Sequence, residues 1–275
     1  MTATEKPPHP APDEYVGEEM TLWEHLQELR ERIVKSALAV ALGFAVGFAF
    51  RHQVFSILIE PYCDLPAGLR AGSAVLGLDD CRLYTPNVTG AFFVSLKAAA
   101  IVAVLIAAPV VCFQIWRFVS PGLRPVERRY AIPFVLLTAV LFASGAIFAY
   151  LIIRPGLRFL LSFAGPEVVS LMDPNAYFGF ILKTMLGFGL SFEVPMAIAI
   201  LTLMGVVTPA GLKKYRRHAV LALFLLAAVI TPTQDPITMS AMALPLILMY
   251  EGNILFARLV ERRRRRASSD LALVE

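Results

Sequence analysis

The chain has 275 residues, of which 57% are hydrophobic, and its mean hydropathy is +0.67. This composition excludes an ordinary soluble domain of the same length and indicates a polytopic membrane protein. The formal net charge is +4, and the arginine clusters lie next to apolar runs, which argues against a nucleic-acid-binding patch.

A helix that crosses a bilayer core of about 30 Å needs roughly 20 apolar residues. Six uncharged or nearly uncharged runs approach that length, and they predict an all-α integral membrane protein with six transmembrane helices. The runs are 36–50, 98–116, 130–153, 184–212, 219–234 and 236–250. The last two are short, so they can span only where the bilayer thins or where neighbouring helices shelter them.

The basic residues predict the orientation of these helices. Most of the 25 Lys and Arg residues lie in the termini and in the loops that share a side with them. The positive-inside rule therefore places both termini in the cytoplasm. Prolines inside the spans invite kinks, which favour a concave wall over a straight bundle. These prolines are Pro109, Pro133, Pro195 and Pro245.

The composition divides the chain into three segments. Residues 1–19 are rich in proline and acidic residues and have no cleavable signal-peptide pattern, so we expect a disordered cytoplasmic leader. Residues 20–257 form the membrane domain. Residues 258–275 are predicted to be a disordered cytoplasmic tail, whose five consecutive arginines meet anionic lipid.

Prolines and glycines punctuate the predicted external loops. The first loop covers about 51–85 and is divided into short pieces, and the second covers about 154–175. Cys63 and Cys81 both lie in the first loop, and in an oxidising compartment they can form a disulfide. Closing such a loop stabilises the fold by about 3 kcal/mol. The alternative is a pair of free thiols, and Cys112, within a span, is a small core residue.

The sequence lacks the motifs of nucleotide hydrolysis and of metal catalysis. It contains no G-x-x-x-x-G-K-[ST], no H-E-x-x-H and no C-x-x-C, and its four histidines are scattered. We therefore expect no enzyme activity, no metal and no cofactor.

Two acids lie in the segments predicted to be cytoplasmic. Thr21 to Glu24 has the form of a capping box, which predicts an amphipathic helix that starts there and runs into the first span. On this helix Glu28 is spaced for an ion pair with Arg32. Glu127 lies in the first turn of the third span, where a carboxylate complements the helix dipole. From the pattern alone, both acids have these structural roles.

Glu193 is the one charged residue within the run 184–212. A charged acid at mid-bilayer costs about 2.5–3.5 kcal/mol, so such residues usually face a bundle interior or a wet cavity. Gly187 and Gly189 on the same helix let a neighbouring backbone approach. Three interpretations stay open: a polar contact for another helix or guest, an acid satisfied by its own bundle, and the ion site of a proton-coupled secondary transporter.

Five motifs resemble the TatC family, the core subunit of the twin-arginine protein translocase. They are HLQELRERI (25–33), APVVCFQIWRFVSPGL (108–123), ERR (127–129), GFGLSFEVPM (187–196) and TPTQDP (231–236). They occur in the order and at the spacing of the family, and together they are highly specific.

The resemblance implies a six-helix, glove-shaped protein of the bacterial cytoplasmic membrane with both termini in the cytoplasm. Such a protein binds the paired arginines of signal peptides on folded export substrates. The resemblance implies that it nucleates assembly with the single-span subunits TatA and TatB. It also implies that several copies form a homo-oligomeric receptor complex, and that the proton-motive force drives transport. The secondary transporter that uses Glu193 is the alternative function.

The family's recognition acids correspond to Glu28 and Glu127, and fixed carboxylates are well suited to bind two guanidinium groups. The resemblance further implies that Arg30 and Phe118 lie near this signal-peptide surface. It implies that Glu193, on the concave side, accommodates partner helices or the inserted signal. Asp235, in the short last external turn, corresponds to another functional position of the family, and Tyr150 corresponds to a polar residue at the external end of the third span. Together with Glu193 they are the predicted intramembrane polar or partner contacts.

Overall fold

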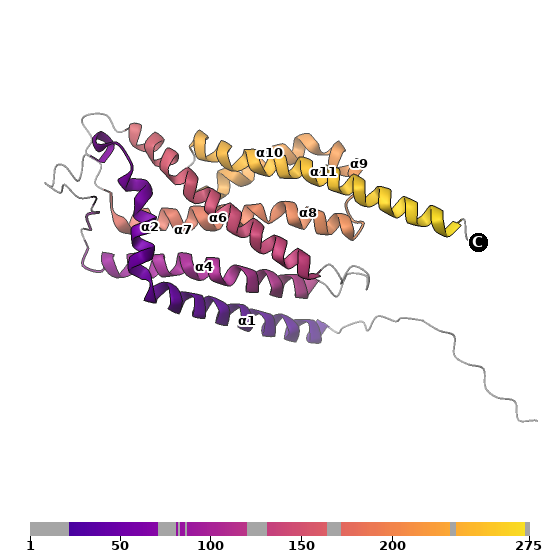
Figure 1. Ribbon diagram of the computed structural model, residues 1–275, viewed down its shortest axis with the longest axis horizontal. Helices are drawn as coiled ribbons and strands as arrows, with labels where there is room; N and C mark the ends of the chain where they lie inside the picture. Colours follow the sequence, from indigo (N-terminus) through magenta and orange to yellow (C-terminus); the bar gives the residue numbers. More distant parts are fainter. Residues whose placement is uncertain are drawn as a thin grey trace, which may run out of the picture.

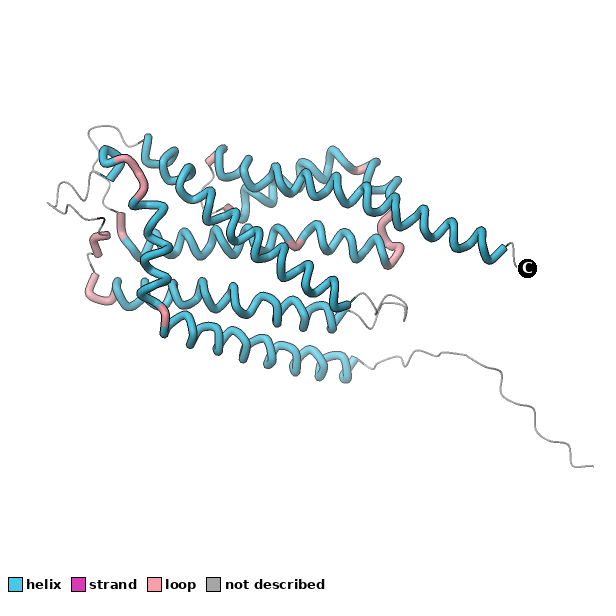
Figure 2. The backbone as a smooth tube through the Cα atoms, viewed as in Figure 1, coloured by secondary structure: helices cyan, strands magenta, loops and turns pink. Residues whose placement is uncertain are grey.

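The computed structural model describes residues 22–70, 81, 83–85, 87–119, 131–163, 172–231 and 235–272. Within these ranges all regular secondary structure is helical, as Figure 2 shows. The elements are α1 (Leu22–Ala49), α2 (Arg51–Cys63), η1 (Ala67–Arg70), α4 (Gly90–Val119), α6 (Ala131–Ser162), α7 (Pro174–Phe192), α8 (Val194–Leu203), α9 (Pro209–Lys214), α10 (Arg216–Ile230) and α11 (Pro236–Ala272). The all-α prediction is confirmed.

The long helices run between two ends of the molecule (Figure 1). We call the end where α1 begins and α11 ends the terminal end, and the opposite end, where α2 and η1 lie, the capped end. α4 ends and α6 begins at the terminal end, whereas α6 ends and α7 begins at the capped end. Both described termini therefore lie on one side, as the charge pattern predicts.

Five helices in the described parts of the chain are long and apolar enough to cross a membrane. The apolar stretches are Trp23–Ala49, Gly90–Ile115, Val135–Ser162, Pro174–Leu203 and Pro236–Arg263. The remaining predicted span corresponds to α10, which has only 15 residues. α10 is as short as expected, and a sixth crossing there stays a prediction.

α1 packs closely along α4, because α1 has glycines on the shared face. A Cβ atom placed on Gly47 would lie 2.6 Å from the carbonyl oxygen of Ala99, and one on Gly43 would lie 3.0 Å from the Cα of Ala103. Small residues of this kind let two membrane helices approach backbone to backbone. The predicted helix that runs from the capping box into the first span is the single helix α1.

α7 and α8 together replace the predicted span 184–212. Asp173 caps α7, since its carboxylate accepts from the amides of Asn175 and Ala176, and Pro174 occupies the first turn. The helix therefore starts ten residues earlier than its uncharged run. It breaks at Glu193 and resumes as α8, which has Pro195 near its start and ends at Leu203.

Three predicted boundaries are corrected. The piece 51–63 of the first predicted loop is the helix α2 with Pro61 inside it. α6 continues past Pro155 to Ser162, so the second predicted loop is shorter than 154–175. α11 has 37 residues and does not end at residue 250, so 258–272 of the predicted tail are helical. Apolar packing outweighs the local proline and charge signals in the first two cases.

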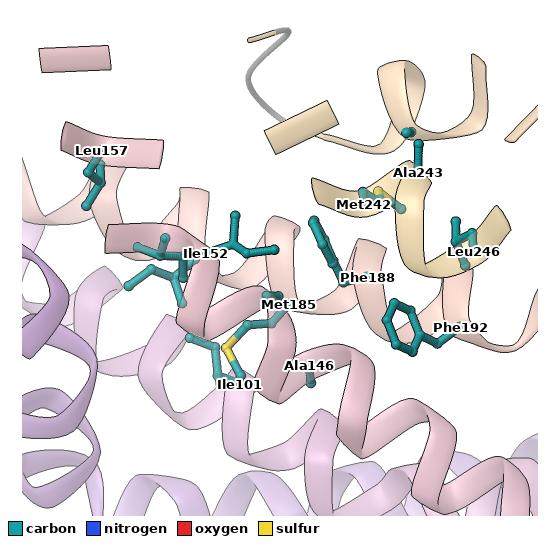
Figure 3. Packing of buried hydrophobic residues seen from close by; sticks show 14 of the residues in the cluster. Ile101, Ala146, Ile152, Leu157, Met185, Phe188, Phe192, Met242, Ala243 and Leu246 are labelled. Atoms are coloured by element: carbon teal, nitrogen blue, oxygen red, sulfur yellow. The ribbon is translucent and has the colours of Figure 1, made fainter. Parts of the chain in front are cut away.

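The core lies where α6, α7 and α11 meet (Figure 3). Phe188 and Phe192 of α7 pack near Met242 and Leu246 of α11. Phe188, Met242 and Leu246 are completely buried. Gly187 faces α10, where a Cβ atom would meet the side chain of Ile230, so the predicted close approach at this glycine is present.

Candidate functional site

The first group of predicted site residues lies at the terminal end, on α1 and α4. Glu28 accepts hydrogen bonds through Oε1 from two nitrogens of Arg32, Nε at 3.1 Å and Nη2. The side chains are only 21% and 14% exposed, respectively. The expected i,i+4 ion pair therefore forms, but it is largely withdrawn from solvent rather than lying on a solvated face.

The two oxygens of the Glu28 carboxylate are not equivalent. Oε1 takes both contacts from Arg32, whereas Oε2 is buried and has no hydrogen-bond partner within the described structure. Buried acceptors are nearly always satisfied, so an open one needs an explanation. Here one oxygen is available to a donor from outside the described residues.

α4 contributes two side chains that the sequence reasoning treated incompletely. Gln114 accepts from Nη1 of Arg32 through Oε1 at 3.5 Å, which extends the ion pair across to α4. The ring of Phe118 stacks on His25 with a centroid separation of 4.5 Å and an interplanar angle of 23°. Gln114 and His25 were not predicted as site residues, although both lie in the quoted motifs.

Arg30 is exposed on α1. Glu127 lies outside the described residues, in the segment 120–130 that joins the end of α4 to the start of α6. The structure thus brings Glu28 and Phe118 to one end of two neighbouring helices, and it leaves the geometry of Glu127 open.

Glu193, the next predicted site residue, lines a cavity of about 410 Å³. α1, α4, α6, α7 and α8 all contribute to its wall, which is almost entirely apolar. The lining residues are Val40, Val104, Ala107, Ala108, Val111, Cys112, Ile115, Thr138, Phe142, Leu186, Leu190, Glu193, Met196, Ala197 and Ile200. This size and this lining suit an apolar guest with few polar groups.

Glu193 is the acidic residue of this wall, and it lies at the break between α7 and α8. Its Oε1 is buried without a hydrogen-bond partner among the described residues. Nearby, Asn253 of α11 donates through Nδ2 to the carbonyl oxygen of Pro195 at 2.9 Å, which fixes the backbone just after the break. The bundle therefore fixes the helix break but leaves one oxygen of the acid unpaired.

Tyr150 has a partner at the capped end. Its hydroxyl donates to the carbonyl oxygen of Ile57 at 2.7 Å. This carbonyl is the one that Pro61 leaves without a helix partner, because proline has no N–H to donate to the residue four positions back. Tyr150 therefore ties α6 to α2, and the described contacts give it a structural role.

Asp235 and the two external cysteines also have partners. Asp235 is buried and accepts through Oδ1 from the amide of Thr238 at 2.8 Å, so it caps the first turn of α11. Cys63 at the end of α2 forms a disulfide with Cys81. Of the two alternatives for these cysteines, a disulfide or a pair of free thiols, the structure has the disulfide.

No group of three or more His, Cys, Asp or Glu side chains arranged for a metal ion occurs in the described ranges. Among the described residues, the buried side-chain oxygens without a hydrogen-bond partner are Oε2 of Glu28 and Oε1 of Glu193. Such groups can bind cations and hydrogen-bond donors.

The sequence of the chain is similar to that of a known protein family. The family model described as Sec-independent protein translocase protein (TatC) matches residues 24–245. A TatC protein of Frankia casuarinae is 44% identical over 89% of this chain and 67% of its own length. A TatC protein of Desulforapulum autotrophicum is 36% identical over 88% of this chain and 85% of its own length.

A solved structure agrees with the sequence relatives. A crystal structure described as twin arginine translocase receptor TatC, in the detergent DDM, superposes with a TM-score of 0.70. It is 34% identical and covers 85% of this chain and 99% of its own length. These similarities favour a non-enzymatic membrane subunit of a protein translocase over a secondary transporter. The chain belongs to the TatC family of Sec-independent protein translocase subunits.

Proposed function

We propose that this chain is the receptor subunit of a twin-arginine translocase and that Glu28 and Glu127 bind the paired arginines of the signal peptide. The observation that carries the proposal is the open oxygen of Glu28, which lies in a largely buried ion pair at the terminal end. The solved structures that superpose on the chain carry the description of receptor, which agrees with this role.

The chemistry of the site suits a guanidinium guest. A carboxylate that is partly shielded from water forms stronger charge-assisted hydrogen bonds than an exposed one, and arginine presents a planar set of donors. Phe118, stacked on His25, offers an aromatic face beside the carboxylate's helix, and Arg30 lies two residues away. Glu127 belongs to the segment 120–130, which follows α4 and precedes α6 in the sequence and lies outside the described residues.

The cavity beside Glu193 has the features of a contact site for a helix within the membrane. Its wall is apolar, and its one acid has an unpaired oxygen that a polar side chain of a guest helix can satisfy. We assign this role to the single-span subunits TatA and TatB or to the inserted signal. The proposed function further includes transport that depends on the proton-motive force and a receptor complex that contains several copies of the chain.

The test is binding of a fluorescent twin-arginine signal peptide to the detergent-purified chain, with a twin-lysine peptide for comparison. We expect Glu28→Gln to weaken binding of the arginine peptide by roughly 10- to 100-fold, since each charge-assisted hydrogen bond contributes about 1.5–3 kcal/mol. Glu127→Gln should act in the same direction.

Glu31→Gln is the matched control. Glu31 lies three residues away on α1 and pairs with Lys35, but the pair is exposed. Its removal should leave peptide binding unchanged. Equal binding of both peptides, unaffected by Glu28→Gln and Glu127→Gln, would exclude the assigned site.

A further inference from the structure

Arg32 already occupies the carboxylate that the proposed function assigns to a signal arginine. Its guanidinium contacts Oε1 of Glu28 through Nε and Nη2, and its side chain is only 14% exposed. This is the contact that an arriving arginine would make, because the donor groups are the same. The chain therefore carries its own guanidinium at the recognition acid.

Gln114 holds this internal guanidinium from the opposite helix. Its Oε1 lies 3.5 Å from Nη1 of Arg32, the nitrogen that does not contact Glu28. Arg32 is thus held between two helices by acceptors on both sides. The exposed Glu31–Lys35 pair on the same helix has Arg117 of α4 within electrostatic range, but its hydrogen bond joins residues of α1 alone.

We propose that Arg32 is an internal competitor for Glu28 and that this competition sets the preference of the site for arginine over lysine. The inference rests on the proposed function of Glu28. Arg32 lies four residues from Glu28 on one helix, so its effective concentration at the carboxylate is high. A signal peptide binds productively only if its own side chain can take over or share that carboxylate.

Arginine and lysine differ in their ability to do so. A guanidinium is weakly hydrated and offers several coplanar donors, so it can replace another guanidinium contact for contact and can also bond the open Oε2. An ammonium is strongly hydrated and acts as a point charge. Displacing Arg32 costs the same free energy for either guest, so the preference comes from sharing the carboxylate. A guanidinium, whose charge is spread over a plane, can bond Oε2 while Arg32 keeps Oε1, whereas an ammonium beside the retained Arg32 carries its full charge at one point. The resident arginine therefore penalises lysine more than arginine.

The experiment compares Arg32→Gln with the unaltered full-length chain in the same peptide-binding assay. Removing the competitor should tighten binding of the twin-arginine peptide by about threefold to tenfold, the range expected for one hydrogen-bonded contact. Binding of the twin-lysine peptide should tighten by a larger factor, so the ratio of the two affinities should fall. Arg32→Lys keeps the positive charge but removes the planar set of guanidinium donors. Its affinity ratio should lie between that of the unaltered chain and that of Arg32→Gln.

Two further variants keep the test decisive. Lys35→Gln removes a cation from the exposed pair on the same helix and should change neither affinity. Gln114→Leu loosens Arg32 without removing a charge, and it should shift the ratio in the same direction as Arg32→Gln but by less. It replaces Arg32→Gln as the deciding variant if that protein does not give a folded, monodisperse peak.

The outcomes separate this inference from the proposed function. Weaker or unchanged binding of the arginine peptide by Arg32→Gln, or an unchanged affinity ratio, overturns the competitor role. If Glu28→Gln still weakens binding of the arginine peptide by the expected factor in that case, the receptor site stands and only the competitor is lost. If Glu28→Gln has no effect, the site itself is lost.

Discussion

The capped end and the terminal end satisfy their polar groups differently. At the capped end Tyr150 and Tyr177 donate to the carbonyl oxygens of Ile57 and Leu58, at 2.7 and 2.8 Å, and Lys97 donates to the carbonyl oxygen of Asn175 at 2.8 Å. The buried side-chain oxygens without partners in the described structure belong instead to Glu28, at the terminal end, and to Glu193, in the cavity.

This difference separates structure from binding. Where polar groups are fully paired, removing one should lower stability and leave binding unchanged. Where a buried oxygen is left open, the protein bears a desolvation cost that only a bound partner relieves. Removing that oxygen should therefore weaken binding and leave stability unchanged or higher. The following predictions test this opposition, from the largest effect to the smallest.

The disulfide of the capped end should have the largest effect on stability. Replacing Cys63 and Cys81 together by serine should lower the free energy of unfolding by about 3 kcal/mol, because it frees a loop whose ends are 18 residues apart. The measurement is denaturant unfolding in detergent, with and without reductant. Cys112→Ser removes a free thiol and serves as control. A loss of signal-peptide affinity in the double variant would contradict the separation of the two ends.

Glu193→Met should change stability in the opposite direction. Removing a buried acid that lacks one partner should raise the free energy of unfolding by up to about 3 kcal/mol, while export by cells that carry the variant should fall. Thermal unfolding of the purified protein and export of a reporter give the two readings. Glu193→Gln keeps a polar group and should gain less stability. A less stable Glu193→Met protein would mean that the acid is satisfied within the bundle.

Tyr177→Phe tests the paired end with a single hydroxyl. The ring is buried, and its hydroxyl donates to Leu58 across 119 residues of sequence. The variant should lose about 1–3 kcal/mol of unfolding free energy and keep normal peptide affinity. Tyr215→Phe alters a ring that is 57% exposed and should have little effect. Equal losses of unfolding free energy in both variants would show that the buried hydrogen bond of Tyr177 does not contribute specifically to stability.

Glu251→Gln should have the smallest effect. Glu251 of α11 pairs with Nε of Arg216 of α10 at 2.5 Å, but the two side chains are 34% and 60% exposed. Exposed pairs contribute at most about 1 kcal/mol, and salt screens them. The loss should therefore vanish when unfolding is measured in concentrated salt. A larger loss, independent of salt, would mean that this pair acts as a buried one.

Much of the fold follows from local patterns, and the exceptions have a common cause. α1 begins at Leu22, as the capping-box pattern of the sequence predicts, and the interruption at Glu193 lies two residues before a proline. No such local pattern predicts α2, because the glycine- and proline-rich sequence around it resembles a loop. Tyr150 and Tyr177 bond its carbonyls from 93 and 119 residues away, and no local window contains those partners.

The candidate site shows the same limit. The Glu28–Arg32 pair follows from helical spacing, so the sequence alone predicts it. The contact of Arg32 with Gln114 and the stack of His25 on Phe118 join α1 to α4, and they depend on how closely these helices approach. Gly43 and Gly47 permit that approach, but their spacing alone does not identify the partner helix.

The continuity of α1 has one more consequence. Glu28 and Val40, which lines the cavity, lie on the same unbroken helix, separated by about 18 Å at 1.5 Å per residue. A ligand that shifts this helix along its whole length moves the cavity wall as well as the recognition acid. By thermodynamic reciprocity, an occupant of the cavity then changes the affinity at Glu28 by the same factor as a guest at Glu28 changes the affinity of the cavity.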